Sequence, residues 1–75
     1  KPPITTEILI DVFEEMKRAI DDLDMDKMDD AIHTLDGYSF HDESHELYLR
    51  LCEAVADMDP DACEEVISDW KQIID

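Results

Sequence analysis

Residues 19–32 read AIDDLDMDKMDDAI, and residues 54–67 read AVADMDPDACEEVI. The second stretch repeats the first: an alanine, three aspartates and a closing isoleucine coincide when the chain is shifted by 54 − 19 = 35 residues. In each stretch an acidic turn separates two runs with apolar residues at helical spacing, which is the pattern of a helical hairpin. The sequence therefore predicts that one kind of hairpin occurs twice.

The first hairpin is expected over about residues 5–37, after a linker stub at residues 1–4 that begins KPP and suits an excised domain. Apolar residues spaced three and four apart predict one helix within residues 4–24 and a second over residues 25–36. The predicted boundary residues are the N-caps Thr5 and Asp24 and the helix end Gly37.

The second hairpin is expected over about residues 40–75. Its first helix should begin within residues 39–44 and continue to Met58, with Met58 buried. Asp59 is the expected N-cap of the last helix, and Pro60 suits its first position, where a missing backbone N–H costs nothing.

Composition limits the fold class. A chain of 75 residues allows one small domain, and a single glycine with three prolines argues against a turn-rich β-fold. We expect an all-α protein, a small antiparallel four-helix bundle built from two similar hairpins. An open tetratricopeptide-like array is the alternative, because the repeat period is similar, although the Trp, Gly-Tyr and closing Pro signature of that family is missing.

Charge limits the partners. Six basic and twenty-two acidic residues leave a net charge of −16, which excludes nucleic acid and direct contact with anionic membranes. No apolar run approaches the roughly 20 residues that cross a bilayer, and no leader peptide is visible. A cytoplasmic location follows, with a parent protein that can itself be membrane-anchored. Cys52 and Cys63 are expected to be reduced apolar side chains.

Two metal motifs come close to a match and fail. Asp22, Asp24 and Asp26 fit three ligand positions of a calcium loop, but Lys27 replaces the turn glycine and His33 the bidentate glutamate. The stretch HDESH at residues 41–45 approximates a zinc-protease helix, without a glutamate base or a third ligand. We therefore expect no metal, no cofactor and no independent enzyme activity.

The stretch AIHTLDG at residues 31–37 resembles the histidine box of histidine phosphotransfer (HPt) domains. His33, Leu35 and Gly37 match that box, Ala31 lies one place early, and Asp36 stands where the family has lysine. The acidic helical hairpins also resemble HPt-like modules at the C-terminal end of bacterial hybrid sensor histidine kinases. The resemblance implies a four-helix bundle whose exposed histidine carries phosphate, with a response-regulator receiver or a neighbouring domain as partner.

Helix geometry tests this candidate. At about 100° per residue, His33 lies about 140° and Gly37 about 180° from Met28 on the apolar face, so both are expected to face solvent. Asp29, Asp30 and Asp36 share that polar side. These carboxylates would repel the acidic pocket of a receiver at the same surface where Gly37 leaves room for docking.

The sequence thus predicts a degenerate HPt-like module that docks a protein or neighbouring domain, with Gly37, Asp29, Asp30 and Asp36 as binding residues. An active relay with His33 as phosphoacceptor is the alternative, and an acidic tetratricopeptide-like binder is the second alternative. Any partner should present a basic patch, and binding should weaken as salt rises.

Overall fold

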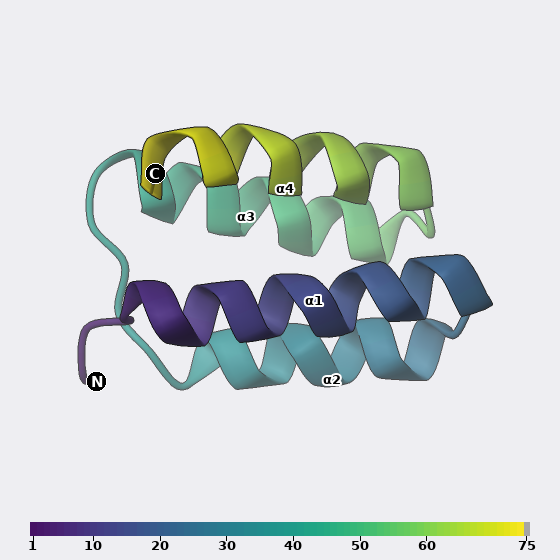
Figure 1. Ribbon diagram of the computed structural model, residues 1–75, viewed down its shortest axis with the longest axis horizontal. Helices are drawn as coiled ribbons and strands as arrows, with labels where there is room; N and C mark the ends of the chain where they lie inside the picture. Colours follow the sequence, from purple (N-terminus) through teal and green to yellow (C-terminus); the bar gives the residue numbers. More distant parts are fainter. Residues whose placement is uncertain (75) are drawn as a thin grey trace. The chain divides into compact units, whose positions relative to one another are not determined.

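The computed structural model describes residues 1–74 and contains four helices (Figure 1). They are α1 (Thr6–Asp22), α2 (Met25–Asp36), α3 (Glu43–Ala56) and α4 (Pro60–Ile74). Helix α1 packs against α2, and α3 packs against α4, so each pair forms a hairpin. The chain divides after Ser39 into two compact units with one hairpin each. The all-α prediction of four helices in two similar hairpins is confirmed. Asp75, the last residue of the predicted second hairpin, lies outside the described residues.

Side-chain caps begin three of the four helices, as predicted. In each case an oxygen of the N-cap side chain accepts a hydrogen bond from the backbone N–H three residues later, which satisfies a donor that the helix itself leaves without a partner. Asp42, at the N-cap of α3, makes no such bond. The three bonds are Ile8 N–H to Thr5 Oγ1 (3.3 Å), Lys27 N–H to Asp24 Oδ1 (3.2 Å) and Ala62 N–H to Asp59 Oδ1 (3.1 Å).

The turns inside the two hairpins are copies of each other. Leu23 and Met58 have left-handed backbones, with φ of 53° and 56°, and each is followed by the aspartate that caps the next helix. In both turns two N–H groups reach back to carbonyls of the preceding helix in the Schellman pattern. The paired bonds are Asp24 to Ala19 (2.8 Å) and Asp59 to Ala54 (3.0 Å), and Leu23 to Ile20 (3.1 Å) and Met58 to Val55 (3.0 Å). The sequence repeat therefore extends to individual hydrogen bonds.

Removing these caps should destabilise the protein. We expect Asp24→Ala and Asp59→Ala each to lower the free energy of unfolding by about 1 kcal/mol, because each leaves a helix N-terminal N–H group without its acceptor. Urea denaturation followed by circular dichroism measures the change. Glu14→Ala removes an exposed carboxylate from the middle of α1 and should change stability by less than about 0.5 kcal/mol. Cap variants as stable as this control would contradict the role of the caps.

The apolar faces predicted from the sequence are largely buried. Among the described residues every buried side chain is apolar. The buried residues of the first hairpin are Leu9, Val12, Phe13, Met16, Ala19, Ile20, Met28, Ala31 and Leu35. Those of the second are Leu47, Leu51, Ala54, Val55, Cys63, Val66, Ile67 and Trp70.

The predicted burial of Met58 is wrong, because its side chain is 70% exposed. Helix α3 ends at Ala56, two residues earlier than predicted, and the left-handed backbone of Met58 turns the side chain away from the helical stripe. Leu23 occupies the same position in the first hairpin and is also 70% exposed. Helical periodicity does not apply beyond the last helical residue.

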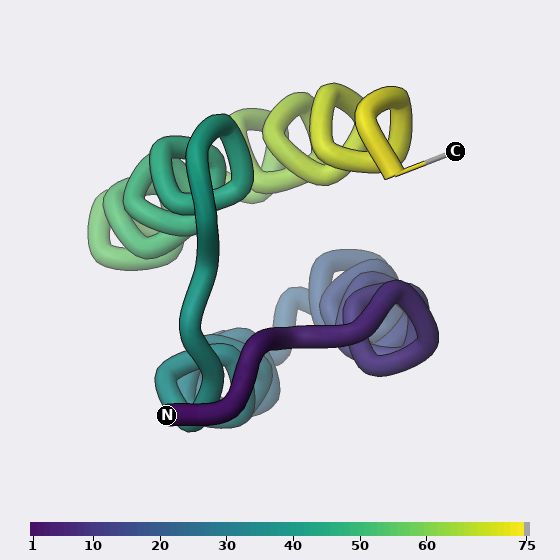
Figure 2. Tube along the Cα trace, turned by 90° about the vertical axis from the view of Figure 1, so that its left-hand side faces the viewer, coloured from purple at the N-terminus to yellow at the C-terminus, as the bar shows by residue number. Residues whose placement is uncertain are grey.

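The segments outside the helices also make defined contacts. The expected linker stub pairs with Ser39 in a short parallel bridge: Ser39 N–H donates to the Pro2 carbonyl (2.8 Å), and Ile4 N–H donates to the Ser39 carbonyl (3.2 Å). In Figure 2 the purple N-terminal segment runs into α1 from this bridge. Phe40, the next residue, stacks on Tyr48 with ring centroids 4.7 Å apart and meets Trp70 edge-on at 5.7 Å. Aromatic contacts thus anchor the start of the second hairpin on its own helices.

Candidate functional site

All five candidate residues of the HPt-like box lie on or directly after α2, and all five are exposed. His33 is in the last turn of the helix, and Gly37 is its C-cap. Asp29, Asp30 and Asp36 are the three carboxylates. The exposed side of α2 therefore carries two carboxylates near the middle of the helix and an imidazole and a third carboxylate in its last turn. The helix dipole adds negative potential at this C-terminal end.

Gly37 ends α2 without using the conformational freedom of glycine. Its φ of −75° and ψ of −4° are right-handed, so other residues can adopt this backbone. A Cβ atom at this position would lie 3.4 Å from the Thr34 carbonyl oxygen, an ordinary van der Waals distance. The local fold does not demand glycine here, and Gly37→Ala is consequently a conservative probe of any partner that approaches this surface.

The hydroxyl of Thr34, next to His33 in the sequence, is directed back to its own helix. Thr34 Oγ1 donates to the Asp30 carbonyl at 3.1 Å. This bond between residues four apart is a common way for threonine to satisfy its hydroxyl within a helix.

The HDESH stretch does not form a helical pair of histidines. His41 precedes α3, whereas His45 lies in its first turn. Between them, the His41 carbonyl accepts from Ser44 N–H at 3.1 Å, and Asp42 has a φ of 53°, so the chain makes a turn before the helix begins. Across residues 1–74, no group of three or more His, Cys, Asp or Glu side chains is arranged to hold a metal ion.

Both cysteines are thiols, and Cys63 is buried on α4. Burial raises the pKa of the Cys63 thiol to about 11, and the nearby Asp59 carboxylate adds to the rise. The thiolate is the nucleophilic form of cysteine, so Cys63 remains protonated and unreactive at neutral pH. Its burial agrees with the predicted role as an apolar side chain.

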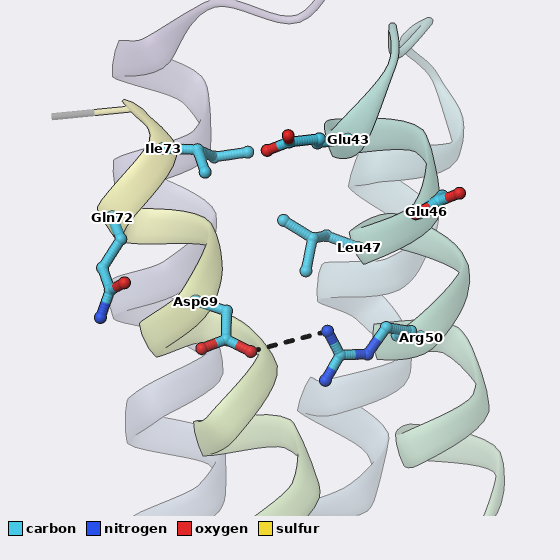
Figure 3. Close-up of a pocket in the computed structure, with 7 residues that line it drawn as sticks. All are labelled: Glu43, Glu46, Leu47, Arg50, Asp69, Gln72 and Ile73. Carbon is cyan, nitrogen blue, oxygen red and sulfur yellow. Dashed lines mark ion pairs between the residues drawn. The ribbon is translucent and has the colours of Figure 1, made fainter.

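Two hollows lie between α3 and α4 of the second hairpin and share a lining residue. One holds about 320 Å³ and includes Glu43, Asp69 and Ile73 (Figure 3). The other holds about 190 Å³ and includes Glu53 and Glu65. Arg50 lines both hollows, and the pair of hollows is called the α3–α4 groove. The Arg50 guanidinium lies 3.6 Å from an Asp69 oxygen, so this ion pair joins α3 to α4.

The first hairpin has a related hollow of about 320 Å³ between α1 and α2. Its lining residues correspond, after the shift by 35, to four residues of the smaller hollow in the second hairpin. The hollow in the first hairpin is lined by Glu15, Arg18, Lys27 and Asp30. The residues 35 positions later, in the second hairpin, are Arg50, Glu53, Ala62 and Glu65. The periodicity of a single helix could not predict these hollows, because each hollow is lined by two helices. The 35-residue repeat, however, shows which lining residues of one hairpin correspond to those of the other.

Comparison of the chain with protein-family models, curated proteins and solved structures gives no match. No helix among residues 1–74 is sufficiently long and apolar to cross a membrane.

Proposed function

We propose that the chain is a non-catalytic, HPt-like helical module of a bacterial two-component signalling protein that docks a receiver or a neighbouring domain in the cytoplasm. The observation that carries this proposal is the distribution of charge. The protein has a net charge of −16, and every described Asp and Glu side chain lies outside the core. A surface of this kind attracts a basic partner and speeds the encounter.

The end of α2 is the docking surface of this proposal. His33, Gly37 and the carboxylates of Asp29, Asp30 and Asp36 are all exposed there and can be reached by a partner. The carboxylates favour a partner with lysine or arginine at the contact, because exposed charges of the same sign would repel. Rising salt should screen these charges and weaken the association.

An active relay is the second candidate, and the exposure of His33 beside the small Gly37 favours it. Phosphate transfer requires the imidazole to attack a phosphoryl group that a partner brings close to the helix. The position of His33 in the last turn of α2 and its acidic neighbours weigh against such an approach, because incoming phosphoryl groups are anionic.

Phosphoramidate, a small donor that phosphorylates competent histidines without a kinase, separates the two candidates. The docking proposal predicts no stable phosphate on the folded wild-type chain, read by intact mass. His33→Ala serves as the control, because it leaves His41 and His45 in place.

An acid-labile phosphate that appears on the wild type and is lost in His33→Ala would overturn the non-catalytic proposal in favour of the relay. Equal labelling of both proteins would assign the phosphate to the other histidines and leave His33 without a transfer role. Circular dichroism before and after treatment shows that both proteins are folded.

A further inference from the structure

We propose that the groove between α3 and α4 is a second interaction surface, and that it binds a basic amphipathic helix of a partner protein. This acidic groove is the pair of adjoining hollows that share Arg50. Figure 3 shows the larger hollow, with Arg50 among its lining residues. It lies on the second hairpin and does not involve His33 or the end of α2.

The groove is long enough for a helix. On the α3 side its lining residues include positions 43, 46, 50, 53 and 57, which lie three or four apart and so form one straight stripe. At about 1.5 Å per residue this stripe extends about 20 Å, which matches about four turns of a bound helix. In helix-in-groove recognition a bound amphipathic helix places its apolar anchors at i, i+3, i+4 and i+7 in a groove of this length.

Charge selects the partner. The groove is lined by one guanidinium, that of Arg50, and by six carboxylates. The carboxylates are those of Glu43, Glu46, Glu53, Asp57, Glu65 and Asp69. Arg50 is itself engaged by Asp69 at 3.6 Å. About half of each of these two side chains is exposed, at 50% and 46%, so their ion pair contributes little stability and can open to a ligand. A helix with lysines or arginines along both edges complements such a groove.

The floor and one end of the groove are apolar, so the bound helix needs an apolar face as well. Buried Leu47, Ala54 and Val66 contribute to the floor. Ile73 lines one hollow and is 44% exposed, which makes it available as an apolar anchor. Partly exposed aliphatic side chains within a charged rim are typical of protein interfaces.

The first hairpin provides an internal comparison. Its corresponding hollow carries two carboxylates and two cations, Glu15 and Asp30 with Arg18 and Lys27. At the four matched positions the first hairpin carries no net charge, whereas the second carries −1, from Glu53 and Glu65 against Arg50.

The test uses a synthetic helical peptide of about 14 residues, with lysines on both edges and leucine and alanine on the face between them. A second peptide with glutamate at every lysine position is its control. Fluorescence anisotropy measures the affinity, and amide chemical shifts in NMR spectra locate the bound peptide. We expect the lysine peptide alone to bind, to shift amides of α3 and α4, and to bind more weakly when salt rises from about 0.05 M to about 0.3 M.

Matched variants distinguish the groove from general attraction to an acidic protein. Glu46→Gln with Glu53→Gln removes two groove carboxylates and should weaken binding by about tenfold. Glu14→Gln with Glu64→Gln removes the same charge from exposed positions outside the described hollows and should change the affinity by less than about twofold. Equal losses in the two variants would overturn the proposal.

The apolar contact has an equally close control. Ile73→Ala should weaken peptide binding by about fivefold. Ile10→Ala, a change of the same kind at a side chain that is 43% exposed on α1, should leave it unchanged. Peptide-induced shifts confined to α1 and α2, or binding only by a proline-containing variant that cannot form a helix, would contradict a helix in this groove. His33→Ala should bind the peptide as the wild type does, so the result is independent of the proposed function of α2.

Discussion

Trp70→Ala should lower the free energy of unfolding by about 3 to 5 kcal/mol, the largest effect that we expect from a single substitution in this chain. Trp70 is fully buried on α4. Its ring contacts Phe40 edge-on at 5.7 Å, and Phe40 stacks on Tyr48 at 4.7 Å. Alanine would leave a large cavity beside Phe40, where the rigid aromatic neighbour cannot collapse into the space.

The expected loss for Trp70→Ala is a large share of the free energy of unfolding of the whole chain. At about 0.05 to 0.15 kcal/mol per residue, a chain of 75 residues has about 4 to 11 kcal/mol of stability. Trp70→Ala is therefore expected to be partly or fully unfolded at physiological temperature. Urea or thermal denaturation followed by circular dichroism measures this, since the substitution removes the single tryptophan and with it the intrinsic fluorescent probe.

Two further variants serve as controls for the stability of Trp70→Ala. Ile73→Ala shortens a side chain that is 44% exposed, three residues along the same helix, and should cost about 1 kcal/mol or less. Trp70→Phe keeps an aromatic ring against Phe40 and should fall between Trp70→Ala and the wild type. A Trp70→Ala protein as stable as the Ile73→Ala protein would show that the aromatic cluster does not support the second hairpin.

Leu23→Gly combined with Met58→Gly should raise stability by about 1 to 2 kcal/mol. Both residues have left-handed backbones, with φ of 53° and 56°. That conformation costs a residue with a Cβ about 1 to 2 kcal/mol, and glycine adopts it freely. Each side chain is 70% exposed, so its removal sacrifices little buried apolar surface. The greater flexibility of glycine in the unfolded chain offsets part of the gain.

A thermal melt should show this gain as a rise in Tm of about 4 to 16 °C for a domain of this size. Ile10→Gly is the matched control, because it also removes an exposed aliphatic side chain, but from the interior of α1. It should lower stability by about 1 kcal/mol or more, since glycine weakens a helix interior. If the turn variants were also destabilised, the left-handed backbones at residues 23 and 58 would not be a source of strain.

The two hairpins share their framework and differ in what they display. The turn between the two helices, together with the aspartate cap that follows it, has the same hydrogen bonds in both hairpins. The first helices of the hairpins differ, since Thr5 caps α1 and Asp42 makes no capping bond to α3. Only the first carries a histidine and a glycine at the end of its second helix, where the second hairpin has Ser68 and Gln72 at the corresponding positions. Only the second carries the acidic groove with its six carboxylates. We infer that the duplicated framework supports two distinct surfaces.

The four helices, the caps of three of them and the repetition of the hairpin could be assigned from the amino-acid sequence alone. Asp24, Asp59 and Pro60 could be assigned in advance because an N-cap or a first-position proline acts within one turn of the backbone. The exposure of His33 could likewise be predicted, since it follows from the position of the residue on a single helix.

Which side chains meet across helices could be seen only in the packed hairpins. The exposure of Met58 is a separate, local case, because the left-handed residue belongs to a turn that helical periodicity does not describe. The stacking of Phe40 on Tyr48 and its contact with Trp70 join residues that are far apart in sequence, and the acidic groove exists only where α3 and α4 lie side by side. The physical reason is range: caps and helical faces depend on neighbours within four residues, whereas packing and grooves depend on how two helices approach each other.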